Sequence, residues 1–477
     1  MPTTAGLVLL PLSLLWLNQP LRLLQLALVA AVFEAAAAVI VGGTFGLPLA
    51  MVPGLLFILY VVGQYLLGMR YPGEGLVLRA AVPLLLLLGY ALLSVVLLPG
   101  AFEGKIMVVP QKLDPSGEIY VPLAFNAGNV TQSLYLTMNV GMAIVVALFV
   151  TRAAISYRSI LRAYLLGGYV AVGIAFWQFA SRVAGVPFPN DVFYSNSGWA
   201  IVEQALGAVP RIQGPFSEPA GLAFYLSGLC FCCLWLCVRG HRLMRPELLL
   251  ALAMLAMFLS TSTTGLVALG GGLPLVLLFA ARKGDVKALG RSASTVVGLA
   301  VASAVALAPV LILKPDLLDS VSAVVEQTLS KTDSDSYEER SLADQMALAT
   351  VGQTSGLGVG WGSFRSSSLV PGLLANAGVF GLAMVLWMAA RLSRLAARAA
   401  VASRGHPGQV LVDGFSAALC GQLAAALLSA PTIGSLAFFL QLGCVIGAAA
   451  RITIDSRSPA RLRAAWPQPA AALPPRT

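Results

Sequence analysis

The hydrophobic pattern of this chain consists of long apolar runs separated by shorter polar segments. A helix needs about 20 mostly apolar residues to cross a bilayer, and most of the runs approach that length. They lie near residues 20–42, 46–68, 79–98, 129–151, 159–182, 216–238, 246–261, 263–281, 291–313, 371–395, 410–430 and 432–450. A shorter stretch at 5–17 suits a half-helix or an interfacial piece. The pattern predicts an all-α polytopic membrane protein with about twelve transmembrane helices.

Composition supports this class. Of the 477 residues, 58% are hydrophobic and only 10% are charged, whereas a soluble domain has about 25% charged residues. An outer-membrane barrel would show alternating segments of about 10 residues, and these do not dominate. All six cysteines lie within apolar runs, which favours small buried side chains over a disulfide framework or a metal site.

The basic residues set the expected orientation. Segments rich in arginine and lysine alternate with segments that are not, so the basic set is predicted to be cytoplasmic. The net charge of +10 then follows from topology and gives no reason to expect nucleic acid as a partner. The basic positions are Arg70, Arg79, Arg152, Arg158, Arg162, Arg239, Arg242, Arg245, Arg282, Lys283, Lys287, Arg291, Arg391, Arg394, Arg398, Arg404, Arg451, Arg457, Arg461 and Arg463.

This topology divides the chain into four parts. Residues 1–313 hold the first set of transmembrane helices, with outer segments near 99–128 and 183–215. Residues 314–370 form a large outer segment, 371–450 the last three helices, and 451–477 a basic cytoplasmic tail. In the large segment we expect a surface helix over DLLDSVSAVVEQTLS, a loop through KTDSDSYEER and a helix through SLADQMALATV. A short hairpin is expected over PSG in the first outer segment.

Three arginines fall on the face where arginine should be scarce. Arg211 and Arg365 each precede a helix in turn-rich sequence, and Arg340 lies within the large outer segment. A guanidinium grips phosphate through two hydrogen bonds. Three of them beside a bilayer suit a lipid-linked phosphate or pyrophosphate. The alternative for each is a pair with a nearby carboxylate or a lipid headgroup.

Two acids are candidates for chemistry. In RIQGPFSEPAGLAFYL, Gly214 and Pro215 predict a turn and Pro219 starts a helix. Glu218 then lies at the helix N-terminus, as a cap, a clamp on Arg211 or a general base. Glu34 lies inside the run 20–42, where an acid is costly and often functional. Its alternative is a helix-packing role.

Other motifs point away from metal or nucleotide chemistry. The glycine-rich GLGVGWGSF lacks the lysine of a P-loop, and we interpret it as a tight connection that lets backbone N–H groups approach a ligand. His241 and His406 both fall in predicted cytoplasmic segments, which excludes a histidine catalyst or zinc site on the outer face. No metal or cofactor is expected.

Several segments resemble a known family. RIQGPFSEPAGLAFYL is similar to the Arg-x-x-Gly-x-Phe-x-x-Pro-Asn signature of the O-antigen ligase and Wzy-type polymerase superfamily. GLGVGWGSFRSSSLVPGLLANAGVFGL is similar to its second signature, a glycine-rich turn followed by a helix. STSTTGLVAL, from Ser260, resembles a segment that reads Ser-Arg-Gly in many members. With about twelve helices and a large outer loop before the last three, the resemblance covers nearly the whole chain.

The resemblance implies a bacterial inner-membrane glycosyltransferase whose active site faces the periplasm. Polymerases of this family join repeat units carried on undecaprenyl pyrophosphate into exopolysaccharide or O-antigen, and ligases pass the chain to lipid A core. It implies inverting transfer without a metal, in which outer arginines hold the pyrophosphate and stabilise its growing charge. Expected partners are the undecaprenyl-pyrophosphate-linked oligosaccharide and membrane lipid, with a chain-length regulator and a flippase of the same pathway as further candidates. The site residues carried over or inferred by position are Arg211, Arg340, Glu218, Glu34, Arg365, Gly214, Ser366 and Ser367.

Departures from the family pattern favour the polymerase. Ligases commonly carry His-Asn where this chain has Ser366, Ser367 and Ser368, and Ala220 replaces the signature asparagine. The arginine of Ser-Arg-Gly is also replaced, near Thr263 and Thr264. The general base is left open between Glu218 and Glu34.

A flippase or other transporter is the alternative from another class. Transporters place ionisable groups near the bilayer midplane, often in paired repeats. The unpaired charges predicted here lie on one face, which favours an enzyme.

Overall fold

The computed structural model describes residues 1–41, 45–111, 119–196, 205–206, 209–282, 335–402, 405–429 and 434–457, with isolated positions between 290 and 298. Seven of the described helices are long and apolar enough to cross a membrane. This confirms a helical membrane protein, whereas most of the predicted span 291–313 lies outside the described residues. The seven helices are α4 (Glu74–Ala101), α5 (Ala127–Val150), α6 (Tyr157–Ala184), α8 (Pro219–Arg239), α14 (Leu369–Ala402), α15 (Gln409–Ser429) and α16 (Leu436–Arg457).

The remaining described elements are shorter helices and small hairpins. The additional helices are α1 (Thr4–Leu15), α2 (Pro20–Ala30), α3 (Met51–Leu66), α7 (Asn190–Phe193), α9 (Pro246–Leu259), α10 (Thr263–Arg282) and α13 (Asp335–Gln353). Three antiparallel strand pairs join them: β1 (Ala37–Val41) with β2 (Phe45–Pro48), β3 (Met107–Val108) with β4 (Val121–Pro122), and β5 (Ala205–Leu206) with β6 (Val209–Pro210).

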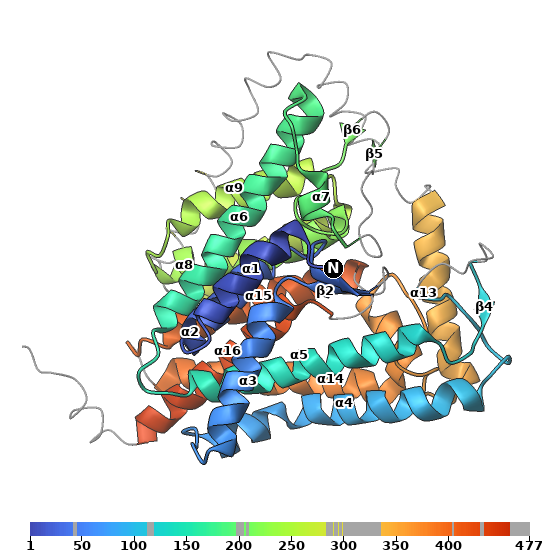
Figure 1. Ribbon diagram of the computed structural model, residues 1–477, viewed down its shortest axis with the longest axis horizontal. Coiled ribbons are helices and arrows are strands. Elements are labelled where there is room, and N and C mark those ends of the chain that lie inside the picture. Colours follow the sequence, from blue (N-terminus) through green and yellow to red (C-terminus); the bar gives the residue numbers. More distant parts are fainter. Residues whose placement is uncertain are drawn as a thin grey trace, which may run out of the picture.

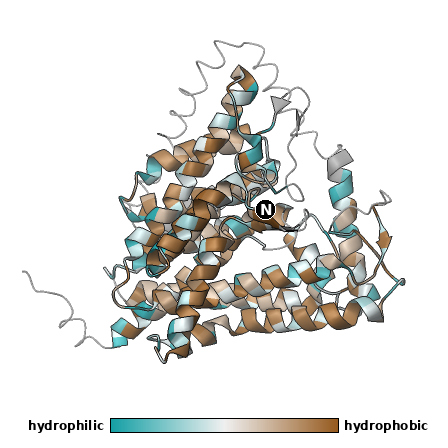
Figure 2. Cartoon of the chain, in the orientation of Figure 1, coloured by the Kyte–Doolittle hydropathy of each residue, from teal (hydrophilic) through white to brown (hydrophobic). Residues whose placement is uncertain are grey.

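The long helices pack around α8 and α16. Helix α8 packs against α9, α10 and α15, while α16 packs against α5, α14 and α15. Helices α4, α5 and α14 lie side by side along one edge, and α13 stands crosswise at one end of them (Figure 1). Apolar residues cover most of the helix surfaces, and polar residues gather at helix ends and loops (Figure 2). This distribution is typical of helices that cross a bilayer.

Small residues bring α16 and α5 close together. A Cβ at Gly443 or Gly447 would collide with the backbone carbonyls of Ala143 and Ala147. Spacing of four residues places both glycines on one helix face, the arrangement that lets membrane helices approach closely. The contact fixes α16 in the centre of the molecule.

The predicted spanning helix over 20–42 is wrong. Helix α2 ends at Ala30, and the chain turns through 31–36 before the β1–β2 hairpin. Tertiary contacts replace the helical hydrogen bonds, because Ala35 N–H donates to Pro215 O (3.2 Å) and Asn196 N–H donates to Ala35 O (3.1 Å). Glu34 therefore lies in a turn, not within a membrane helix.

The large outer segment is described only from Asp335 onward. The predicted surface helix over DLLDSVSAVVEQTLS lies outside the described residues, as does the PSG turn between β3 and β4. The helix expected over SLADQMALATV is confirmed within α13. The loop predicted through KTDSDSYEER is wrong in its second half, because α13 already begins at Asp335.

Helix α14 is broken at Gly378. This residue has φ +63° and ψ −166°, a backbone conformation that is essentially limited to glycine. The glycine-rich segment fills the break, since Val379 N–H donates to Gly356 O (2.9 Å) and Val359 N–H donates to Ala375 O (2.7 Å). A Cβ at Gly378 would collide with the carbonyl of Gly356. The break and the glycine-rich segment therefore depend on each other.

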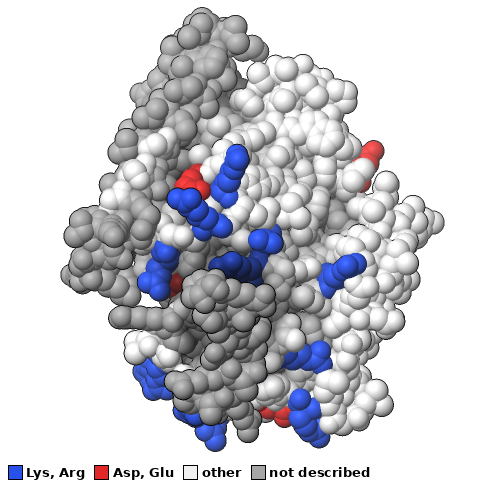
Figure 3. Space-filling model, turned by 90° about the vertical axis from the view of Figure 1, so that its left-hand side faces the viewer, with Lys and Arg blue, Asp and Glu red and all other residues white. Residues whose placement is uncertain are grey.

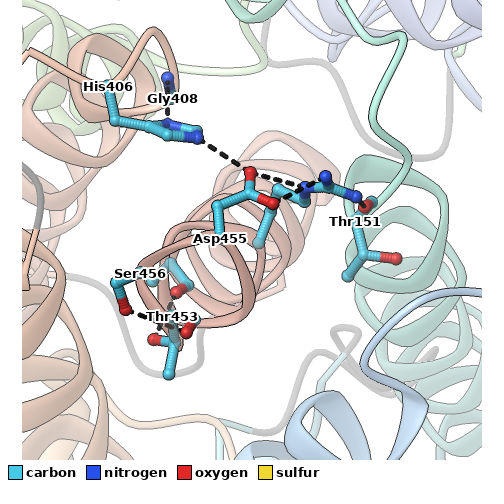
Figure 4. A network of polar contacts seen from close by, with 8 residues as sticks. Thr151, His406, Gly408, Thr453, Asp455 and Ser456 are labelled. Carbon is cyan, nitrogen blue, oxygen red and sulfur yellow. Dashed lines mark hydrogen bonds and ion pairs between the residues drawn. The ribbon is translucent and has the colours of Figure 1, made fainter. Parts of the chain in front are cut away.

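Ion pairs tie the helices together at one end, where basic side chains gather (Figure 3). We call this the basic end; it includes the end of α8, the start of α15 and the end of α16. Asp455 accepts hydrogen bonds from His406 (3.1 Å) and Arg451 (2.7 Å), and Arg451 also donates to Thr151 O beyond α5 (Figure 4).

A second carboxylate, Asp413 on α15, binds Arg239 and His241 in the same way. Both histidines of the chain thus pair with carboxylates at the basic end. They lie at the far end of α8 from its N-terminus.

We predict that Gly378→Ala lowers the thermal unfolding midpoint of the detergent-solubilised protein by several degrees. Strain of this kind costs about 1–3 kcal/mol, and the new methyl group must displace the Gly356 backbone. Gly89→Ala is the matched control, because a Cβ at Gly89 in α4 meets no atom within 4 Å. A melting temperature unchanged by Gly378→Ala would contradict the proposed dependence of α14 on the glycine-rich segment.

Candidate functional site

The loop formed by residues 211–218 connects β6 to α8 and is held in place by a polar side chain of α6. Gln178, 2% exposed, accepts hydrogen bonds from the N–H groups of Gln213 and Gly214, both at 2.9 Å. Its amide nitrogen donates to the Tyr194 hydroxyl (2.6 Å), which in turn donates to Gly214 O (2.6 Å). The loop backbone is therefore satisfied by one buried glutamine and one tyrosine.

The apolar residues of this loop are buried, whereas its two charged residues are partly exposed. Gly214 has φ +56° and lies against Ala175 of α6, so this position requires glycine for both its conformation and its close approach. Ile212 and Phe216 are buried, and Phe216 stacks against Tyr225 of α8 at 5.3 Å between ring centroids. Arg211 and Glu218 remain partly exposed.

Arg211 is bound to a break between two other helices. Its Nε donates to Thr261 Oγ1 at 3.1 Å, and its backbone carbonyl accepts from Arg182 of α6. Thr261 lies between α9 and α10 and has φ +49°, a conformation that is a genuine outlier for a β-branched residue. Strained residues of this kind cluster at functional sites. The segment STSTT, singled out in the sequence, thus contacts the arginine of RIQGPF.

The charges of Arg340 and Glu218 act on Arg211. Burial lowers the pKa of Arg211, the positive charge of Arg340 lowers it further, and the carboxylate of Glu218 raises it. Arg340 lies near the start of α13 and is exposed. Two guanidinium groups from segments more than a hundred residues apart in sequence therefore share one region.

Glu34 borders the same region from the N-terminal segment. Its Oε2 lies 3.4 Å from the point where a Cβ on Gly221 would stand, and Ser217 Oγ lies 3.7 Å from that point. Gly221 belongs to the first turn of α8, whose N-cap residue is Glu218. The Glu218 side chain makes no capping hydrogen bond. Both acids thus lie at the N-terminal end of α8.

The cluster lies at the opposite end of α8 from the basic end. Helix α8 has 21 residues, which corresponds to a length of about 30 Å at 1.5 Å per residue. That length matches the hydrocarbon thickness of a bilayer, about 30 Å. The helix begins at the cluster and ends at Arg239, which pairs with Asp413. The candidate site and the basic end are thus separated by one membrane-spanning helix.

The other predicted site residues gather around α13 and β3. The Arg365 side chain is exposed, and the backbone N–H of Arg365 donates to Val109 O (2.8 Å) next to β3. Asp344 of α13 accepts from the N–H of Ser367 at 2.7 Å, and the Ser366 hydroxyl donates to Ser368 O. These contacts anchor the start of α14.

Helix α13 connects the two groups. Arg340 and Asp344 are four residues apart, so they share one face of α13. The charge of Arg340 lowers the pKa of Arg211. Asp344 accepts a hydrogen bond from the backbone N–H of Ser367, just before α14. A change in the position of α13 would therefore move Arg340 and the 366–368 segment together.

The glycine-rich segment has a different local role from the one expected. Its N–H groups donate to protein acceptors: Gly358 to Thr354 Oγ1, Trp361 to Ser94 Oγ and Phe364 to Asn376 Oδ1. Asn129 of α5 adds donations to Trp361 O and Ser363 Oγ, both at 2.8 Å. The segment packs across α4, α5 and α14 as a scaffold, so these N–H groups are not available to cradle a ligand.

Sequence reasoning missed the residues that position the site. Gln178, Arg182, Tyr194 and Asp344 were not singled out, although a glutamine within the apolar run 159–182 is a detectable signal. Their partners are far away in sequence, which a single sequence does not show.

Comparison with known proteins adds no family assignment. No protein-family model matches the chain, and a search of curated proteins returned no match.

We predict that Gln178→Leu destabilises the protein and Gln178→Glu does so less. Leucine leaves two buried N–H groups without an acceptor, and each unsatisfied group costs about 1–3 kcal/mol. Glutamate keeps the acceptor oxygen. Thermal unfolding of the purified variants measures the difference, with Gln345→Leu as control because Gln345 is exposed on α13. Equal stability of Gln178→Leu and wild type would show that this side chain does not hold the loop.

Proposed function

We propose that this protein is a membrane glycosyltransferase that polymerises repeat units linked to undecaprenyl pyrophosphate, at the outer face of the bacterial inner membrane. The observation that supports it is the charge interaction of Arg211 with Arg340 and Glu218 at the loop before α8, with Glu34 next to the first turn of that helix. Two guanidinium groups that repel each other are stabilised by a dianion such as a pyrophosphate.

The location of the cluster supports the choice of donor. A pyrophosphate carried on a polyprenyl chain lies at the membrane surface, beside the hydrocarbon. The cluster lies at one end of a helix that is long enough to span the bilayer, opposite the basic end. If the basic end is cytoplasmic, as the positive-inside rule predicts, the cluster faces the periplasm.

The proposed reaction needs a phosphate-binding group and a base. An acceptor hydroxyl attacks the anomeric carbon of the donor sugar, and the bond from that carbon to the pyrophosphate oxygen breaks. The electron pair leaves with the lipid pyrophosphate, whose increased negative charge Arg211 and Arg340 stabilise. The hydroxyl proton passes to a carboxylate, for which Glu34 and Glu218 are the candidates.

Replacing Arg211 tests the proposal in cells. We expect Arg211→Ala to reduce polymer formation at least about 100-fold, the effect of removing one oxyanion-stabilising donor, with single repeat units accumulating on the lipid. Arg211→Lys keeps the charge but loses the planar fork, so we expect an intermediate defect. Profiles of lipid-linked sugars and finished polysaccharide, at matched membrane levels of each variant, measure both.

Arg398→Ala is the matched control, because Arg398 is exposed near the end of α14. Long polymer stranded on its carrier outside the membrane would indicate a ligase instead. Intermediates trapped on the cytoplasmic side would indicate a flippase. Normal polymer from a well-expressed Arg211→Ala variant would contradict a catalytic role for this residue.

A second prediction identifies the base. Glu34→Gln and Glu218→Gln each remove one carboxylate with little change in size, and loss of the base should slow turnover about 10²–10⁴-fold. The other variant should change the KM for donor more than it changes kcat. Rates with isolated lipid-linked repeat units in nanodiscs measure this, with Glu247→Gln at the start of α9 as control. Wild-type turnover in both variants would exclude these carboxylates as the base.

A further inference from the structure

Arg152, just beyond α5 at the basic end, has only neutral partners among the described residues. Its Nη2 donates to Gln64 Oε1 at 2.5 Å and to the Tyr71 hydroxyl at 3.4 Å, and lies 2.8 Å from Met69 Sδ. Within the described residues, Nε and Nη1 have no acceptor and no carboxylate lies within ion-pair distance. A guanidinium carries five N–H donors, so much of its capacity is open to another anion.

The surroundings hold this guanidinium in one position. It lies over the rings of Tyr71 (4.9 Å) and Phe149 (5.2 Å). The Tyr71 hydroxyl donates to Gln64 Oε1 at 3.2 Å, and Gln64 Nε2 donates to the Tyr60 hydroxyl at 2.7 Å. Arg152 is thus wedged between the ends of α3 and α5 and the start of α4. A pre-positioned fork of this kind loses little entropy on binding phosphate.

A second cation directly precedes Tyr71, whose ring lies against the Arg152 guanidinium. Arg70 follows α3, stacks on Tyr65 at 4.2 Å and donates to the Tyr65 carbonyl. The acid nearest in sequence is Glu74, whose Oε1 accepts the N–H of Tyr71 at 2.7 Å. It keeps its charge, and two arginines against this one carboxylate (+2 − 1) leave a net charge of +1. This corner of the molecule therefore carries an excess of positive charge.

Helix α3 also exposes an apolar stripe. Leu59, Val62 and Leu66 of α3 are 66%, 39% and 80% exposed, and their spacing places them on one helix face. Leu67, at the end of the helix, is 90% exposed. The loop that joins α3 to α4 lies at the lower left of Figure 1, at the same end as the end of α16. The stripe lies on the face of α3 opposite to Gln64 and reaches the end of the helix that precedes Arg70.

We propose that this corner is a binding site for an anionic phospholipid of the leaflet at the basic end. The fork of Arg152, with Arg70, receives the phosphate, and an acyl chain lies along Leu59, Val62 and Leu66. Basic pockets between membrane helices bind anionic headgroups through this combination of charge and apolar surface. The proposal does not depend on the proposed enzymatic activity, because it uses none of the residues of the candidate site.

Native mass spectrometry of the detergent-solubilised full chain with added phosphatidylglycerol tests the site. One basic group near an anionic lipid strengthens binding about fivefold, so Arg152→Gln should weaken binding of the first lipid about fivefold or more. Arg152→Lys should recover part of the affinity. Arg457→Gln is the matched control, since it removes the same charge from an exposed position at the end of α16.

Each outcome decides the proposal. Selective weakening by Arg152→Gln, with tighter binding of phosphatidylglycerol than of phosphatidylcholine, would support it. Equal weakening by Arg457→Gln, or equal binding of both lipids, would overturn it in favour of non-specific charge attraction. Displacement by millimolar inorganic phosphate would show an ion site without a role for the apolar stripe and would also overturn it. If Arg152→Gln does not fold, Arg70→Gln carries the same comparison, and an unchanged affinity there would contradict the site.

Discussion

Backbone groups inside a membrane protein need partners, because the bilayer offers none, and this constraint shapes the candidate site. Among the described residues, helical geometry is interrupted next to the candidate site or within a long helix at residues 31–36, at Ser260–Ser262 and at Gly378. Two of these interruptions are satisfied by distant parts of the chain and the third by a side chain of its own segment. Ala35 pairs with Pro215 and Asn196, Val379 pairs with Gly356, and Ser262 N–H is bound by Ser260 Oγ. Irregular backbone is tolerated at such depth only where protein or a polar cavity surrounds it.

Two of these breaks hold functional candidates. The turn after α2 carries Glu34 to the first turn of α8, and the break between α9 and α10 carries Thr261 to Arg211. If α2 continued without a break, Glu34 would lie inside that helix and away from the loop at 211–218. These breaks in the helices therefore bring polar side chains together at the candidate site.

The sequence was sufficient for the parts of the fold that depend on local composition. Runs such as 129–151 and 410–430 became α5 and α15, because 20 apolar residues in a row leave few alternatives. The turn at Gly214 and the helix start at Pro219 also followed from residue type, since both depend on backbone conformation alone.

The failures came from long-range contacts. The run 20–42 is apolar enough for a helix, yet hydrogen bonds to Pro215 and Asn196 replaced the helical ones after Ala30. The glycine-rich segment was expected to let backbone N–H groups approach a ligand. The N–H groups of Gly358, Trp361 and Phe364 instead donate to Thr354, Ser94 and Asn376, whose positions depend on how α4, α13 and α14 pack.

The same distinction applies to the candidate site. Arg211, Arg340 and Glu218 could be proposed from residue type and predicted topology, because an arginine on an otherwise cation-poor face needs an explanation. The side chains that position them could not, since Gln178 acts through the backbone of residues 213 and 214, and Asp344 acts through the backbone of residues 367 and 368. Such bonds depend on where a carbonyl or N–H is placed, not on which side chain it carries. The charged groups of this candidate site can thus be predicted from the sequence, whereas the hydrogen bonds that orient them depend on the folded chain.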